Sequence, residues 1–141
     1  MIRTILVAAL LVAASAALAA PDAFADPCTA KLPSKEGATF TGKVRHIVDG
    51  DGFCVGISSD PKTWIEVRMA DFNGPELSTP EGKRGKAILA SKIAGKEVSC
   101  TTAKGRNGKT TTYDRVLARC KLGSDAISGI LRAAKDPQGG N

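Results

Sequence analysis

Residues 39–72, TFTGKVRHIVDGDGFCVGISSDPKTWIEVRMADF, contain three strand-like runs separated by two turns. Residues 39–48 and 64–72 carry apolar side chains at roughly every second position, and residues 53–57 form a short apolar run between them. The first turn is Asp49-Gly50-Asp51-Gly52, in which glycine permits positive φ and aspartate can accept bonds from nearby backbone N–H groups. This stretch predicts a three-stranded meander.

The hydrophobic period then changes, and residues 80–94 are predicted to form a helix. Ser78 or Thr79 can cap its first turn, Pro80 suits the first helical position, and Glu81 lies near the positive end of the helix dipole. Gly95 stands where a left-handed C-terminal cap is expected.

Two more strands and a second helix are predicted after the first helix. The strands cover residues 97–102 and 111–122, joined by a loop over 104–110 with Asn107-Gly108 at its tip. Residues 125–135 indicate a short C-terminal helix, weakened by Gly129. Three strands, a helix, two strands and a helix predict a mainly β fold with helices (α+β), a five-stranded, partly open Greek-key barrel of the OB type.

The ends of the chain have a different composition. Residues 1–25 combine Arg3, an apolar run and small residues typical of a cleaved signal peptide, with cleavage before Asp26 or before Ala20. A membrane anchor is the alternative, but the apolar run is shorter than the roughly 20 residues that a spanning helix needs. We expect an exported protein, periplasmic or secreted, with an N-terminal arm over 26–36, a domain over 37–135 and a disordered tail over 136–141.

Charge favours an anionic partner. The formal net charge is +6, and it is unchanged by removal of residues 1–25, which contain one cation, Arg3, and one anion, Asp22. A small basic protein attracts nucleic acid, anionic membranes or acidic polysaccharides, so charge alone does not choose among them.

The four cysteines all follow residue 25 and predict two disulfides in an oxidising compartment. Zinc is disfavoured, because no C-x-x-C pair occurs and His46 is the single histidine. Three pairings are possible. Cys100 and Cys120 lie on the two strands of the last predicted hairpin, which favours their pairing and leaves Cys28 with Cys54.

Several polar residues near predicted strand ends have the side chains that phosphodiester hydrolysis requires. Acidic and carbonyl oxygens can hold a hard cation, a carboxylate can align or deprotonate water, and guanidinium groups can bind phosphate bidentately. Taken alone, the D-G-D turn is more simply a hairpin signal, whereas an arginine within an apolar strand needs a partner if it faces inward. The set comprises Asp49, Asp51, Arg68, Glu76, Tyr113 and Arg115.

Three blocks of this sequence, in order, resemble the signature of the staphylococcal-nuclease (thermonuclease) family over roughly residues 39–134. They are VDGD at 48–51, VRMADFNGPE at 67–76 and YDR at 113–115, against a family pattern of D-G-D, R-L-x-x-x-D-x-P-E and Y-G-R. The resemblance implies an OB-type barrel and a calcium-dependent nuclease that cuts DNA and RNA with little sequence preference and leaves 3′-phosphates.

Residue by residue, the resemblance implies catalytic roles for Arg68, Glu76 and Arg115. The two arginines would bind the scissile phosphate, and Glu76 would orient or deprotonate the attacking water. The implied Ca²⁺ ligands are Asp51, Asn73 and the carbonyl of Gly74, while Tyr113 would contact the substrate and Asp49 would shape the turn.

The sequence departs from the family pattern at three places. Asn73 stands where the family has an aspartate, which predicts weaker calcium binding, although Asp71 lies two residues earlier. Gly74 replaces a common threonine, and residues after Lys135 lack the aromatic base-stacking positions of the family. Two other functions therefore stay open: a weakened OB-type module that binds single-stranded nucleic acid or another polyanion, and a structural domain of the cell envelope.

Other residues have weaker claims to a role. The loop residues Lys104, Arg106 and Lys109 form a basic tip that can either contact nucleic acid or remain a solvated loop. Three basic residues at the start of the first helix are expected on a solvated face: Lys83, Arg84 and Lys86. His46 and Trp64 are expected to have packing roles.

Overall fold

The computed structural model describes residues 27–139. The predicted signal peptide with both of its cleavage positions, residue 26 of the predicted arm and residues 140–141 of the predicted tail lie outside this range. The elements in chain order are β1 (Thr39–Ile47), β2 (Gly52–Gly56), the 3-10 turn η1 (Pro61–Thr63), β3 (Trp64–Met69), α1 (Pro80–Ile93), β4 (Glu97–Thr102), β5 (Thr111–Thr112), β6 (Arg115–Leu122), β7 (Asp125–Ala126) and α2 (Ile127–Ala133).

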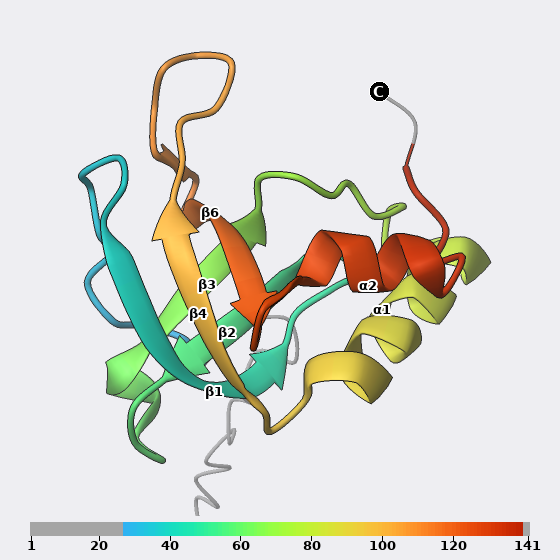
Figure 1. Ribbon diagram of the computed structural model, residues 1–141, viewed down its shortest axis with the longest axis horizontal. Helices are drawn as coiled ribbons and strands as arrows, with labels where there is room; N and C mark the ends of the chain where they lie inside the picture. Colours follow the sequence, from blue (N-terminus) through green and yellow to red (C-terminus); the bar gives the residue numbers. More distant parts are fainter. Residues whose placement is uncertain (1–26, 140–141) are drawn as a thin grey trace, which may run out of the picture.

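Five strands close into a barrel, which confirms the predicted fold class (Figure 1). The strand order β3-β2-β1-β4-β6 is antiparallel throughout. A parallel pairing of β3 with β6, in which Arg68 lies opposite Leu117, then closes the ring. This closure brings the 67–76 segment beside the 113–115 segment.

The first helix begins and ends close to the predicted positions. The Thr79 side chain accepts a hydrogen bond from the Gly82 N–H at 3.0 Å, and Pro80 occupies the first turn. Gly95, just past the C-terminal cap, has φ of +73°, the left-handed conformation that glycine adopts without a steric penalty.

The region 111–135 differs from the prediction in two places. The single strand expected over 111–122 is divided into β5 and β6 by a tight turn, because Tyr113 adopts φ of +53° and Thr112 pairs directly with Arg115. The helix expected from residue 125 begins at Ile127, because residues 125 and 126 pair with β6 as the short strand β7.

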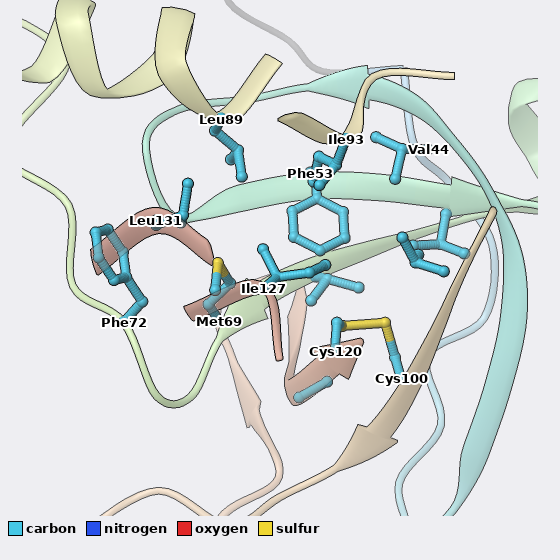
Figure 2. Close-up of a cluster of buried hydrophobic side chains, with 14 of the residues drawn as sticks. Val44, Phe53, Met69, Phe72, Leu89, Ile93, Cys100, Cys120, Ile127 and Leu131 are labelled. Atoms are coloured by element: carbon cyan, nitrogen blue, oxygen red, sulfur yellow. A yellow bond between two sulfur atoms is a disulfide. The ribbon is translucent and has the colours of Figure 1, made fainter. Parts of the chain in front are cut away.

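Both helices pack against the barrel and complete its core (Figure 2). Leu89 and Ile93 of α1 and Ile127 and Leu131 of α2 are fully buried, together with Phe53 of β2. In Figure 1 the two helices lie side by side along one side of the barrel. Within residues 27–139, neither helix is long and apolar enough to cross a membrane.

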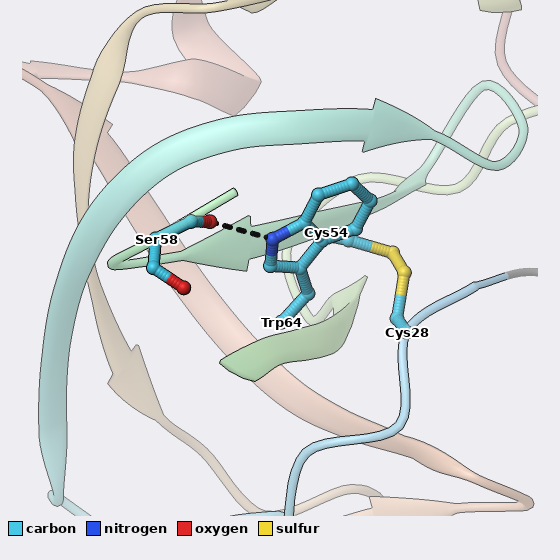
Figure 3. The surroundings of a disulfide bond; sticks show 4 residues. All are labelled: Cys28, Cys54, Ser58 and Trp64. Atoms are coloured by element: carbon cyan, nitrogen blue, oxygen red, sulfur yellow. Dashed lines mark hydrogen bonds between the residues drawn. A yellow bond between two sulfur atoms is a disulfide. The ribbon is translucent and has the colours of Figure 1, made fainter. Parts of the chain in front are cut away.

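Both predicted disulfides are present, Cys28–Cys54 and Cys100–Cys120. The first tethers the N-terminal arm to β2 beside Trp64, whose indole N–H donates to the Ser58 carbonyl at 2.8 Å (Figure 3). The second joins directly opposed residues of β4 and β6 in the core. Two disulfides indicate folding in an oxidising compartment.

Residues 136–139 do not behave as the disordered tail that the sequence predicted. Asp136 is only 5% exposed, and its backbone N–H donates to the Leu131 carbonyl at 3.0 Å. Gly139 donates its N–H to the Asn73 carbonyl at 2.7 Å. Composition suggested fraying, but these tertiary contacts hold the segment against the loop that precedes α1.

Candidate active site

The D-G-D turn is stabilised by its own side chain and packs closely against neighbouring backbone. The Asp49 carboxylate accepts the Asp51 N–H at 3.1 Å, and the turn is closed by a bond from the Val48 N–H to the Gly52 carbonyl at 2.9 Å. A side chain on Gly74 would come within 3.1 Å of Gly50 backbone, so the turn and the 73–74 segment are in direct contact. This contact fixes the position of the buried Asp51 carboxylate.

Arg68 connects this turn to the loop after β3. Its Nη2 atom lies 3.2 Å from Asp51 Oδ2 and donates to Asn73 Oδ1 at 2.7 Å. Its Nη1 atom donates to the backbone carbonyls of Met69 and Phe72. The strand arginine therefore has several partners, and both ends of its guanidinium fork are engaged by protein acceptors.

Burial, together with the nearby Asp49 carboxylate, raises the pKa of Asp51 to about 6. The Arg68 guanidinium and the Gly74 N–H, which donates to Asp51 Oδ2 at 2.8 Å, act in the opposite direction but do not compensate. A nearby cation stabilises the charged form of such a buried carboxylate more than it stabilises an exposed one.

Arg115 reaches the same turn from β6. Its Nη1 atom lies 3.7 Å from Asp49 Oδ2, and its side chain is 21% exposed. Tyr113, at the turn between β5 and β6, is 94% exposed. The structure thus links Arg115 to the D-G-D turn and leaves Tyr113 on the surface.

Glu76 lies apart from this network but close to two of its members. It is exposed, and it lines a hollow of about 320 Å³ together with Asn73 and Gly74. Its backbone carbonyl accepts from the Thr79 N–H at 2.9 Å, so the cap of α1 holds the segment in place. The Glu76 carboxylate makes no hydrogen bond or ion pair with any residue between 27 and 139, and is accessible to solvent.

The donor atoms of the sequence-predicted metal ligands are all oxygen. Arg68 Nη2 contacts both Asp51 Oδ2 and Asn73 Oδ1, whereas Gly74 faces Asp51 with its N–H. Oxygen donors of this kind, with an acidic group among them, suit Ca²⁺, which takes six to eight such ligands. All three predicted ligands also have protein partners. Asp51 Oδ2 accepts from the Gly74 N–H and contacts Arg68, Asn73 Oδ1 accepts from Arg68, and Gly139 packs over the Gly74 carbonyl. Residues 27–139 contain no group of three or more His, Cys, Asp or Glu side chains placed to hold a metal.

The docked C-terminal segment forms one wall of the Glu76 hollow, which sequence reasoning missed. Residues 137–139 line it, and the Asn73 side-chain amide donates to the Gly139 carbonyl at 3.4 Å. A side chain at position 139 would come within 2.8 Å of the Gly74 carbonyl oxygen. The only sign of this docking in the sequence is the glycine at position 139, and a glycine is equally typical of a frayed chain end.

Two further hollows extend from Arg68, and basic residues line both. One of about 430 Å³ includes Arg106 and Arg132, and one of about 470 Å³ includes Lys104 and Arg106. Lys104 forms an ion pair with Glu36 at 3.1 Å, so part of the predicted basic tip has an acidic partner. Arg132 was not singled out from the sequence, because its position depends on how α2 packs.

Comparison with known proteins adds no assignment. No model of a known protein family matches the chain, and no curated protein sequence matches it.

Proposed function

We propose that this chain is an exported, calcium-dependent nuclease of the staphylococcal-nuclease type, which hydrolyses DNA and RNA with little sequence specificity. The observation that carries the proposal is a continuous set of contacts among three sequence blocks far apart in the chain. Asp51 contacts Arg68 and Gly74, Arg68 contacts Asn73, and Arg115 contacts Asp49. These are the blocks on which the family resemblance rests.

The two arginines suit the binding of a phosphodiester. Arg68 and Arg115 approach the D-G-D turn from β3 and β6, so a phosphate near the turn has a guanidinium on two sides. Because both Nη atoms of Arg68 already have protein acceptors, a phosphate must replace at least one of them, and the Asn73 amide oxygen is the acceptor on the site side. Charge that develops on the phosphate would then be stabilised by preorganised donors.

Glu76 is the carboxylate available for the water. It is exposed, has no protein partner in the described chain and shares its hollow with Asn73 and Gly74. In this role it accepts a proton from, or orients, the water that attacks in line with the departing 5′ oxygen. A calcium ion held by Asp51, the Asn73 amide oxygen and the Gly74 carbonyl would supply Lewis-acid stabilisation of the phosphate.

The first test is digestion of single-stranded DNA by residues 26–141, with calcium and with a chelator. Glu76→Gln should lower the rate by at least ~10²-fold, the scale of a lost general base. Glu81→Gln is the matched control, because Glu81 lines the same hollow and has no assigned role. Near-normal cutting by Glu76→Gln would contradict the role given to this residue.

One observation favours a second function, binding of single-stranded nucleic acid without turnover. Both Nη atoms of Arg68 are engaged by protein acceptors, and Asn73 supplies no negative charge for calcium. If the wild-type chain binds the DNA but cuts it at no calcium concentration, the binding function replaces the nuclease. If it does not bind at moderate salt, a structural role in the envelope is favoured instead.

A further inference from the structure

Three arginines line a single hollow of about 430 Å³ beside the candidate active site. They are Arg68 from β3, Arg106 from the 104–110 loop and Arg132 from α2. Residues 69–73 and Gln138 of the docked C-terminal segment line the rest of it. Three elements distant in sequence therefore direct cationic residues to one place, and its volume falls within the range of small-ligand sites.

The hollow has little compensating negative charge. Among residues 27–139, Asp71 is the only acidic residue that lines it, and the Asp71 Oδ2 atom accepts a hydrogen bond from Ser128 Oγ at 2.7 Å. The other carboxylate oxygen, Oδ1, is buried away from solvent. Neither oxygen forms an ion pair with the three arginines in the described part of the chain. Arg68 is paired with Asp51 outside the hollow, so an anion in the hollow would meet uncompensated guanidinium charge at Arg106 and Arg132.

Arg132 is held in position with most of its donors still free. Its Nη2 atom donates to the Asp71 carbonyl, and its guanidinium carbon lies 5.8 Å from the ring centre of the buried Phe72. A cationic side chain already held over an aromatic ring loses less side-chain entropy on binding a ligand than a freely rotating side chain does. Its Nη1 and Nε atoms have no hydrogen-bond partner among residues 27–139, and Arg106 has none for any of its side-chain nitrogens.

We propose that Arg106 and Arg132 together bind one phosphate group of a nucleic-acid strand, the neighbour of the phosphate at Arg68. This inference rests on the proposed function, because Arg68 is shared between the hollow and the active site. Planar guanidinium forks match phosphate oxygens bidentately, and two forks on opposite chain segments can engage a single phosphate. The site would hold the strand in register for cleavage and needs no base contact.

The test measures binding of a fluorescein-labelled eight-nucleotide oligodeoxythymidine to residues 26–141 in chelator, between 50 and 200 mM salt. Arg132→Gln and Arg106→Gln should each weaken binding by about 5- to 20-fold at low salt and lower the salt slope by about 0.7, the value for one single-strand phosphate contact. The double variant should lose little more than either single variant, because both residues serve one phosphate. Arg119→Gln is the control, because Arg119 is an exposed β6 residue that lines none of these hollows.

Unchanged binding by Arg106→Gln would overturn the proposal. This variant is the safer of the two for the fold, because Arg106 lies in an exposed loop, whereas Arg132 packs on Phe72. Fully additive losses in the double variant would also overturn it, since the arginines would then bind separate phosphates. Binding of heparin but not of the oligonucleotide would also overturn it, and would indicate that the hollow binds a polysaccharide sulfate group and not a nucleic-acid phosphate.

The same experiment separates this inference from the proposed nuclease. Weakened binding by both single variants in a protein that never cuts would support the phosphate site and refute the nuclease. Calcium-dependent cutting by a protein whose binding is insensitive to both substitutions would support the nuclease and refute the site.

Discussion

Asn73 forms hydrogen bonds with two residues from different parts of the chain, Arg68 and Gly139. Its side-chain oxygen accepts from Arg68, its side-chain nitrogen donates to Gly139, and its backbone carbonyl accepts the Gly139 N–H. An amide suits this position because it can accept and donate at once, which a carboxylate cannot do. Asn73 therefore gives up negative charge near the candidate calcium site and gains a contact with the C-terminal segment.

Asn73→Asp should lower the calcium concentration needed for half-maximal cleavage. The new carboxylate adds a charged oxygen donor beside Asp51, and an effect of about tenfold, or about 1.4 kcal/mol, is expected. Initial rates across a calcium titration measure this change. Asn107→Asp adds the same charge at the exposed loop tip and should have no such effect; a calcium requirement that stays the same or rises in Asn73→Asp would contradict the prediction.

Asp136 is a buried carboxyl group without a hydrogen-bond partner in the described chain. Burial raises its pKa from 3.8 to about 6, although the charge of Arg84 acts to lower it. Because the folded pKa lies above the unfolded value, the unfolded chain releases its proton first as pH rises. The folded state therefore loses stability between about pH 4 and pH 6, and the loss is constant above that range.

Asp136→Asn should remove this loss. At pH 7.5 the free energy of unfolding should rise by up to about 3 kcal/mol, the equivalent of the pKa shift, and at pH 4 it should change little. Urea denaturation at the two pH values measures the difference, with the exposed Asp125→Asn as control. A gain of equal size at both pH values would show that hydrogen bonding or packing, and not ionisation, is responsible.

At the scale of elements, the start of α1 fixes the segment that carries Glu76. A Cβ atom on Gly82 would lie 1.9 Å from the Glu76 carbonyl oxygen, so the first turn of the helix and this segment are in backbone contact. The side chain of Thr79 donates to the same carbonyl at 2.7 Å. Glycine at 82 is thus required for close approach, not for a special φ angle.

Gly82→Ala should destabilise the protein by about 1–3 kcal/mol and displace Glu76, with a matching loss of cleavage. Gly129→Ala in α2 is the matched control, because apart from its chain neighbours and its own helix backbone no atom of residues 27–139 lies within 4 Å of a Cβ there. This control should gain about 0.5–1 kcal/mol from the higher helix propensity of alanine. Equal effects of the two substitutions on the urea midpoint would show that the contact with Glu76 does not constrain the helix.

Elements specified by local signals were predictable from the sequence. The meander followed from apolar alternation around the D-G-D turn, and α1 followed from the cap at Thr79 and the glycine at 95. The break at Tyr113 was not predictable, because its positive φ is imposed by the pairing of Thr112 with Arg115. The docking of residues 136–139 and the position of Arg132 likewise depend on tertiary contacts that leave no periodic pattern.

At the scale of the whole molecule, barrel closure and two disulfides hold the site together. The parallel β3–β6 pairing places Arg68 and Arg115 near one turn, and Cys100–Cys120 joins β6 to β4 behind it. The sequence predicted that the three sequence blocks come together. The individual contacts between them depend on closure of the barrel. Glu76 and Tyr113 lie outside those contacts, and the roles of all the predicted site residues stay predictions.

Loss of the two disulfides should have unequal effects on stability. The bridges span 26 and 20 residues, so the entropic stabilisation expected from each is similar, about 3 to 4 kcal/mol. Removing Cys100–Cys120 deletes two buried sulfur atoms from the core, because both residues are 1% exposed, whereas in the other bridge only Cys54 is fully buried and Cys28 belongs to the arm.

The alanine pair at 100 and 120 should therefore melt lower than the pair at 28 and 54. Thermal unfolding of both double variants beside the wild type measures the order, and DNA cleavage below the lower melting temperature should be nearly unchanged in both, since no cysteine lines the site. A larger loss in the 28/54 variant would mean that the tethered arm, held also by the bond from the Ala30 N–H to the Trp64 carbonyl, contributes more to the barrel than its core disulfide does.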